Sequence, residues 1–180
     1  LLLDEFPALG KLGIFEQALA YFGGWNIKAY LICQDKAQLD AAYGKDESIT
    51  SNCHVTVAYA PNKVETAKYL SDRLGVTTVI KEQESVSLQG GVGIFAKKSV
   101  TKSQQEVQRA VLTPDEIMRL PGPVKDADQM IIEPGDMLIF AAGFPVVYGK
   151  QILYFLDKTF SERAKINAPE KSDSLAETSE

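Results

Sequence analysis

Short apolar runs alternate with amphipathic stretches at the start of the chain. Residues 1–3 are leucines followed by two acidic residues and a proline, a pattern typical of a buried parallel strand that ends at a breaker. Residues 12–24 space their apolar side chains at helical intervals and end in two glycines, which predicts an amphipathic helix. Residues 26–33 form a second apolar run. A strand, a helix and a strand in this order predict a βαβ unit with parallel strands.

The same alternation continues as far as residue 75. Residues 35–44 predict a short helix with Asp35 as its cap, and residues 54–60 predict a third strand that a proline ends. Residues 62–75 predict a further helix, with Asn62 as its cap and a glycine as its stop. The regular order of strands and helices predicts an α/β fold with a mainly parallel sheet flanked by helices.

The second half of the chain predicts added hairpins. Residues 76–105 alternate β-branched and polar side chains around two glycines, as an exposed hairpin or long loop does. Residues 130–143 predict a second hairpin that turns at the proline and glycine at positions 134 and 135. Residues 150–155 predict a final strand.

Two other segments carry local signals. Residues 113–121 predict a short helix that Thr113 caps, with Glu116 completing a capping box. The chain then divides into residues 1–166, which we expect to form one folded unit, and residues 167–180, a polar and acidic tail that we expect to be disordered.

Composition excludes several classes of protein. A net charge of −5 argues against a globally basic nucleic-acid binder, although Lys97, Lys98 and Lys102 form a local basic group. That group is either a solvated loop or a loop that contacts phosphate. Two cysteines give no disulfide framework, and Cys53 beside His54 makes a poor zinc site because adjacent strand residues point to opposite faces.

The first strand ends in candidate chemistry. Three leucines followed by Asp4 and Glu5 match a Walker B element, in which one carboxylate holds Mg²⁺ through water and the second orients the attacking water. Gln34 follows the neighbouring strand, and the carboxyl ends of parallel strands meet at one edge of a sheet. We therefore expect Gln34 to lie close to both carboxylates, where it can reach a γ-phosphate.

The phosphate cradle of such a site is missing from this sequence. The pattern GxxxxGK[ST] does not occur, and its nearest approach, residues 92–99, has Val92 and Lys97 where glycines are required. We therefore expect this chain alone to be inactive as an ATPase. Because the chain opens inside an apolar run, we also expect further sequence, including part of the sheet, to lie upstream.

Several ordered motifs resemble one known family. They are LLLDEFPALGKL, QDKAQLDAAYG, RLGVTTV, LTPDEIMRLP, PGDMLIFAAGFPVVYGKQILYF and DKTFSERAKI. Together they resemble the carboxyl-terminal part of TraG-type coupling proteins of conjugation and type IV secretion, over roughly residues 1–168. The ordered combination is specific, whereas each motif alone is not.

The resemblance implies the carboxyl-terminal part of a RecA-like, P-loop ATPase that uses ATP and Mg²⁺. Such a protein is anchored at the cytoplasmic face of the bacterial inner membrane, forms a hexamer, and delivers relaxase-bound single-stranded DNA to the channel proteins of the secretion system. Asp4 and Glu5 match the family's Walker B pair, with Asp4 at the metal and Glu5 catalytic. Gln34 matches its glutamine near the γ-phosphate, with a catalytic and nucleotide-binding role.

One basic residue of the family's site is not carried over. Some relatives have an arginine where this chain has Gly23. Lys28 is a possible substitute, and the alternative is that it is an exposed lysine at the start of a strand. The identity of a basic residue supplied by a neighbouring subunit therefore stays open.

Two functions remain open from the sequence. The first is the catalytic part of an ATP-driven DNA translocase. The alternative is a non-catalytic assembly or cargo-recruitment module, whose working surfaces are the hairpin of residues 76–105 and the acidic tail.

Overall fold

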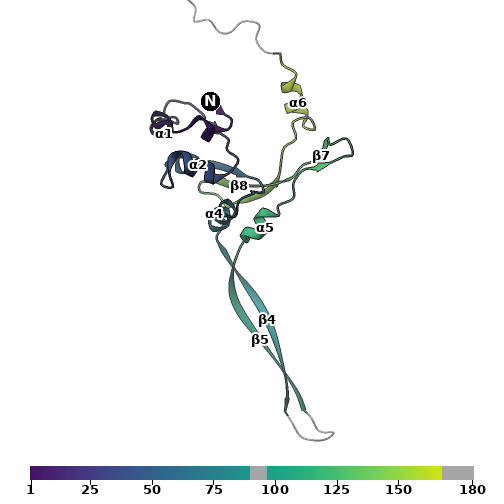
Figure 1. Ribbon diagram of the computed structural model, residues 1–180. Helices are drawn as coiled ribbons and strands as arrows, with labels where there is room; N and C mark the ends of the chain where they lie inside the picture. The colour runs from purple at the N-terminus through teal and green to yellow at the C-terminus, as the bar shows by residue number, and fades with distance from the viewer. Residues whose placement is uncertain (90–96, 168–180) are drawn as a thin grey trace, which may run out of the picture.

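The computed structural model describes residues 1–89 and 97–167, with side chains described for residues 1–84 and 102–167. Short helices and strands form a body, and a long two-stranded hairpin projects from it (Figure 1). The two termini of the described chain lie on the side of the body away from the hairpin (Figure 1).

The first unit of the body is the predicted βαβ element. Strand β1 (Leu2–Leu3) pairs in parallel with β2 (Tyr30–Leu31). The connection contains a 3₁₀ turn, η1 (Phe6–Leu9), and helix α1 (Gly13–Leu19). Both strands and the helix are shorter than the sequence predicts, but their order and the parallel pairing are confirmed.

Two helices complete this unit around an aromatic core. Helix α2 (Lys36–Tyr43) begins at Asp35, whose Oδ1 accepts a hydrogen bond from the Gln38 backbone at 3.0 Å, so the predicted cap is confirmed. Helix α3 (Ile49–Asn52) follows. The buried residues of this core are Phe6, Leu19, Leu39, Tyr43 and Ile49.

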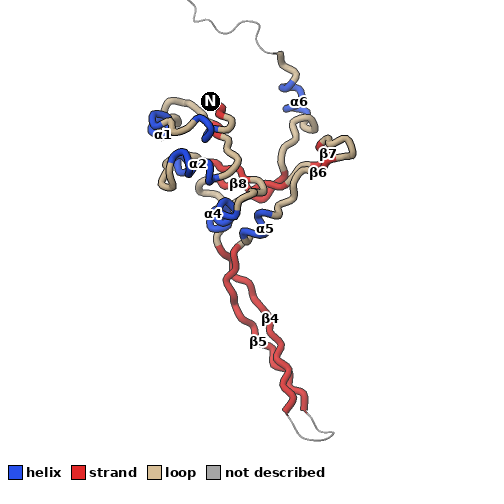
Figure 2. Tube along the Cα trace, in the orientation of Figure 1, coloured by secondary structure: helices blue, strands red, loops and turns tan. Residues whose placement is uncertain are grey.

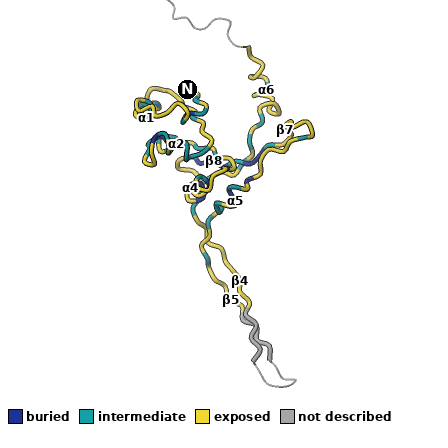
Figure 3. Tube along the Cα trace, viewed as in Figure 1, coloured by how far each residue is buried: buried dark blue, intermediate teal, exposed yellow. Residues whose placement is uncertain are grey.

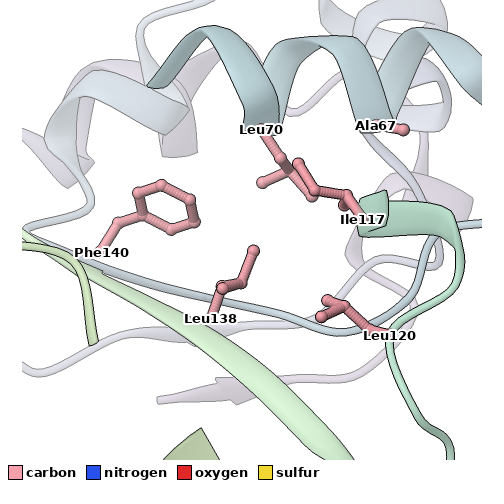
Figure 4. Close-up of a cluster of buried hydrophobic side chains, with 6 residues drawn as sticks. All are labelled: Ala67, Leu70, Ile117, Leu120, Leu138 and Phe140. Carbon is pink, nitrogen blue, oxygen red and sulfur yellow. The ribbon is translucent and has the colours of Figure 1, made fainter. Parts of the chain in front are cut away.

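The second unit of the body is a three-stranded antiparallel sheet with two helices (Figure 2). Its strands lie in the order β3 (Val55–Ala58), β8 (Asp136–Ala141) and β9 (Val147–Lys150). Helices α4 (Val64–Leu74) and α5 (Pro114–Met118) pack against the sheet. The buried side chains between them, drawn in Figure 4, are Ala67, Leu70, Ile117, Leu120, Leu138 and Phe140.

The α/β class is confirmed, but the prediction of a mainly parallel sheet is wrong for the described residues. There, only β1 and β2 pair in parallel, and every other ladder is antiparallel. Strand β3 pairs with β8, which follows it by about 80 residues in the chain. A local alternation of strands and helices carries no information about such distant partners.

The projecting hairpin consists of β4 (Val76–Gln89) and β5 (Lys97–Ala110). The two strands pair antiparallel without interruption, from Val76 opposite Ala110 to Gln89 opposite Lys97. The hairpin predicted for residues 76–105 is therefore confirmed, while the glycines at its predicted turn lie outside the described residues. We call this hairpin the arm.

The hairpin predicted for residues 130–143 is wrong. Strand β7 (Ile131–Glu133) pairs with β6 (Val124–Lys125), not with β8. The chain instead passes from one sheet to another at Gly135, where a Cβ atom would lie 2.8 Å from the backbone of Gly122. Here the Pro-Gly pair serves a close crossing of two backbone segments, which a turn signal alone does not distinguish from a hairpin.

The strand predicted for residues 150–155 is also wrong. Strand β9 ends at Lys150, and residues 151–157 lead without a strand into helix α6 (Lys158–Ala164). An apolar run predicts a strand only if its side chains are buried in a sheet, and these side chains are not. They are exposed on the connection to α6, as at Ile152 and Tyr154.

Three helix caps were predicted, and those at Asp35 and Thr113 are confirmed. Thr113 and Glu116 form the full capping box of α5. Asn62 is not the cap of α4, because that helix begins after Lys63 with no side-chain cap bond.

Among the described residues, no helix is long and apolar enough to cross a membrane.

Candidate functional site

The carboxyl ends of β1 and β2 lie side by side at one edge of the first unit. The Tyr30 amide donates to the Leu1 carbonyl at 2.8 Å, and the Ile32 amide donates to the Leu3 carbonyl at 3.0 Å. The Phe6 amide then donates to the Ile32 carbonyl at 2.9 Å, which extends the contact past the end of β1. We call the edge formed by Asp4, Glu5 and Gln34 the rim.

The rim brings two of the predicted site residues into direct contact. Gln34 Nε2 donates to Glu5 Oε1 at 3.2 Å, although the two residues are 29 positions apart. Asp4 is exposed, and its Oδ1 accepts a hydrogen bond from the Glu5 backbone amide at 3.0 Å. The prediction that Asp4, Glu5 and Gln34 share one edge is therefore confirmed, while their chemical roles remain predictions.

Glu5 has an unusual backbone conformation. Its φ of 46° and ψ of 42° lie in the left-handed region, which costs a residue other than glycine about 1–3 kcal/mol. Two hydrogen bonds hold it there: its amide bonds Asp4, and its carbonyl accepts from the Ala8 amide at 2.8 Å. Because such strain concentrates at functional positions, the conformation supports a functional role for this turn.

The buried side chain of Phe6 anchors the strained turn. It is only 1% exposed, and its ring lies 5.3 Å from that of Tyr43 and 5.0 Å from that of Phe15. The Tyr43 hydroxyl in turn accepts a hydrogen bond from the Leu12 amide at 3.1 Å. The core of the first unit therefore fixes the position of Glu5 through its neighbour in the chain.

Sequence reasoning missed Gln38, which orients Gln34. Gln38 Oε1 accepts a hydrogen bond from the backbone amide of Gln34 at 3.1 Å. The Nε2 atom of Gln38 donates to the side-chain Oε1 of Gln34 at 3.5 Å. With its oxygen facing Gln38, Gln34 directs its Nε2 toward Glu5. This contact could have been predicted. Gln38 lies in the first turn of a helix whose cap at Asp35 was predicted, and Gln34 directly precedes that cap.

Lys63 also approaches the rim and was missed. Its Nζ lies 3.3 Å from Asp35 Oδ2, next to Gln34 in the chain. Lys63 precedes α4, in the second unit, so this ion pair joins the two units. No local pattern connects a lysine before one helix with the cap of another, so this ion pair could not be predicted from the sequence.

The carboxylates near the rim act on the thiol of Cys33. Burial raises the pKa of the Cys33 thiol, and the carboxylates of Asp35 and Glu5 raise it further because they oppose a thiolate. Carboxylate oxygens such as those of the exposed Asp4 suit a hard cation such as Mg²⁺. The described residues hold no cluster of three or more His, Cys, Asp or Glu side chains able to bind a metal by themselves.

The other basic candidates lie away from the rim within this subunit. Lys28 is exposed and precedes β2, whereas Gln34 follows that strand. On the arm, Lys102 forms an ion pair with Glu84 at 2.7 Å. The side chains of Lys97 and Lys98 lie outside the described ones.

A family model and curated relatives match nearly the whole chain. The model described as "Type IV secretory system Conjugative DNA transfer" matches residues 1–177. Two conjugal transfer proteins TraG from Escherichia coli are 52% and 54% identical over 99% and 97% of the chain. A TraG from Rhizobium radiobacter is 28% identical over 86% of it. The chain spans 28% of the length of each E. coli relative.

Solved structures show the fold. The bacterial conjugative coupling protein TrwBdeltaN70 in an unbound form superposes with a TM-score of 0.54 and 19% identity, over 83% of this chain and 30% of that one. The plasmid coupling protein TrwB in complex with ADP and Mg²⁺ gives 0.53 and 19%, over 83% and 29%. The described chain is thus a partial RecA-like α/β domain. The chain belongs to the type IV secretory system family of conjugative DNA transfer proteins.

Proposed function

We propose that this chain supplies the Walker B side of a nucleotide-hydrolysis site in an ATP-driven coupling protein that moves DNA during conjugation. The observation that carries the proposal is the contact between Glu5 and Gln34 across two parallel strands. It joins a candidate base to a candidate γ-phosphate sensor at the edge where ligands of α/β sheets bind. The family match and the ADP and Mg²⁺ bound to TrwB support this choice of chemistry.

Each rim residue has a distinct proposed role. Asp4 is exposed and acidic, and its carboxylate would hold Mg²⁺, an ion that prefers oxygen ligands. Glu5 orients and deprotonates the attacking water. Gln34 donates its amide either to Glu5, as observed, or to a γ-phosphate, and so senses whether that phosphate is present. Bound Mg²⁺ would neutralise charge on the phosphates.

The remaining parts of the site come from elsewhere in the intact protein. The sequence contains no GxxxxGK[ST] pattern, so a phosphate cradle is not among its own motifs. We propose that this chain alone does not turn over ATP, and that residues 1–166 are the carboxyl-terminal part of the nucleotide-binding domain. Residues 167–180 form a separate acidic segment in this proposal.

The wider assembly is proposed from the family. The intact protein forms a hexamer at the cytoplasmic face of the bacterial inner membrane. It receives a relaxase bound to single-stranded DNA and passes the strand to the channel proteins of the secretion system. A basic residue from the adjacent subunit completes the hydrolysis site.

Turnover by a chimaera tests the proposed chemistry. The matching stretch of E. coli TraG is replaced by this chain, and plasmid transfer first shows that the chimaera works. Glu5→Gln should lower ATP turnover about 100-fold or more while ATP still binds, because only the proton transfer is removed. Glu162→Gln, on α6, is the matched control and should leave turnover unchanged. Unchanged turnover in Glu5→Gln would contradict the proposal.

A second candidate function is a non-catalytic assembly or cargo-recruitment module. The arm favours it, because a 14-residue antiparallel ribbon outside the body is a contact surface. If its basic group binds DNA phosphates, Lys97→Ala with Lys98→Ala should weaken DNA binding and reduce its dependence on salt. Unchanged DNA affinity would remove the arm as a DNA contact.

A further inference from the structure

A pocket that shares no residue with the rim lies between α3 of the first unit and the sheet and helix α4 of the second unit. Its volume is about 350 Å³, within the range of small-ligand sites. It lies where the start of β3 meets the end of β8, beside α3 and the last turn of α4. Its polar and aromatic lining includes Thr50, Ser51, His54, Arg73, Phe140 and Phe144.

Arg73 lies against two aromatic rings in this pocket. The centre of its guanidinium lies 4.3 Å from the centroid of the Phe140 ring and 5.6 Å from that of Tyr69. Its Nη1 donates to the Tyr69 hydroxyl at 3.3 Å. Among the described residues no carboxylate lies within 4.0 Å of it. A cation fixed against ring faces keeps further N–H donors for an anion.

The rest of the lining fits an anion that carries an aromatic group. Among the described residues, no acidic side chain lines the pocket. Glu47 lies behind it and bonds the Thr50 amide at 2.8 Å, but an ion pair with Lys36 at 2.9 Å compensates its charge. His54 is exposed, and Phe144 at the pocket edge is 74% exposed. An exposed phenylalanine and an arginine thus line the same pocket, and proteins bind single-stranded nucleic acids with aromatic and basic side chains of this kind.

We propose that this pocket is a contact site for single-stranded DNA, in which Arg73 and His54 bind a phosphate and Phe144 stacks on an unpaired base. The proposal rests on the proposed role in DNA transfer and names a contact for its substrate. It is independent of the arm, because none of the residues that line the pocket belongs to β4 or β5. Such a site contacts the phosphate charge and the flat face of a base, which all nucleotides share, so it binds single strands of any sequence.

Binding of a labelled oligo-dT to this chain, followed by fluorescence anisotropy without ATP, tests the proposal. Phe144→Ala should weaken binding about 5- to 100-fold, whereas Phe144→Tyr should keep most of it. Arg73→Gln should weaken binding and lower the salt slope by about 0.7, the value for one phosphate contact with a single strand. The matched controls are Phe155→Ala and Arg163→Gln, exposed residues outside the pocket, which should bind normally.

Several outcomes would overturn the proposal. Phe144 is largely exposed, so its variants stay folded and give an answer even if Arg73→Gln loses stability. Full affinity in Phe144→Ala would exclude stacking, and equal competition by oligo-glutamate would show an acidic-peptide site instead. A loss confined to Lys97→Ala with Lys98→Ala would place the contact on the arm. Because this assay contains no ATP, its result is separate from that of the turnover experiment on Glu5.

Discussion

The body and the arm of this protein are stabilised in different ways. The body buries two clusters of apolar side chains, one under the rim and one under the β3–β8–β9 sheet. In the arm no described side chain is buried, and only Val107 and Ala110 are even half-buried (Figure 3). Its strands are held by their hydrogen-bond ladder and by cross-strand pairs such as Lys102 with Glu84.

This difference in burial determines how firmly each region holds its side chains in position. Packing in the body fixes Phe6, and through it the left-handed turn at Glu5 and the contact with Gln34. The arm meets the body at a short clamp, where the Ser71 hydroxyl donates to the Leu112 carbonyl at 2.7 Å and the Val111 amide donates to the Gly75 carbonyl at 3.0 Å. Packing in the body therefore fixes the positions of the rim side chains, whereas the arm extends a surface away from them.

The largest expected effect is the loss of the anchor beneath the rim. Phe6→Ala removes a fully buried ring and should lower the free energy of unfolding by about 3–5 kcal/mol, measured by urea denaturation. Phe144→Ala, at a largely exposed ring, should change the free energy of unfolding by no more than about 0.5 kcal/mol. A similar loss in both variants would show that burial does not distinguish these positions.

The next effect is steric and lies at the crossing near β8. A Cβ on Gly135 would lie 2.8–2.9 Å from backbone atoms of residues 121–123, so Gly135→Ala should lower the free energy of unfolding by about 1–3 kcal/mol. Gly149→Ala is the matched control, because its nearest contact would be the flexible end of Met137 at 3.8 Å. Equal thermal midpoints for the two variants would contradict the close crossing.

A third prediction concerns pH and the buried Asp136. Hydrogen bonds from Lys150 and then from Tyr148, the latter at 2.5 Å, lower the pKa of Asp136 below its ordinary value of 3.8. A carboxyl group whose pKa is lower in the folded state stabilises the protein above its unfolded pKa and loses this contribution as pH falls through the folded pKa. Asp136→Asn should therefore be less stable than the unaltered chain at pH 7, and the difference should shrink below about pH 4.

The thermal midpoints of the two chains between pH 7 and pH 3 measure this effect. Asp128→Asn, at an exposed residue between β6 and β7, is the control and should follow the unaltered chain. A stability difference that grows on acidification would have the wrong sign and would exclude the ion pair as its cause.

The smallest expected effect on stability comes from removing the arm. Replacing residues 81–105 by Asn-Gly joins Ile80 to Glu106, which are paired opposite each other, through a two-residue hairpin turn. Because no described side chain of the removed segment is packed in either core, the free energy of unfolding of the body should change by no more than about 0.5 kcal/mol. A loss above about 2 kcal/mol, measured by urea denaturation, would show that the arm belongs to the folding unit.

The same contrast explains how much of the fold was predictable. Periodicity, caps and breakers are local signals, and they gave β1, β2, β3, the arm and the capping box at Thr113. Strand partners are not local, so β8 was assigned to a hairpin when it instead pairs with β3 and β9. Helix α6 was not predicted, because its side chains include none that is buried and so carry little pattern.

The candidate site shows the same limit. The meeting of Glu5 and Gln34 followed from one rule, that parallel strands end at the same edge. The left-handed backbone of Glu5 was not predictable, because a glutamate has no preference for that conformation. The approach of Lys63 depends on the packing of the second unit against the first, which no segment encodes by itself.

The most direct test of the central claim is a double-mutant cycle across the rim, measured as ATP turnover in the E. coli TraG chimaera. Glu5→Gln and Gln34→Ala are made separately and together, with Gln105→Ala on the arm as a neutral control. If the two side chains act on the γ-phosphate as one unit, the double variant loses about as much turnover as Glu5→Gln alone. Losses that multiply, as for independent residues, would contradict the account.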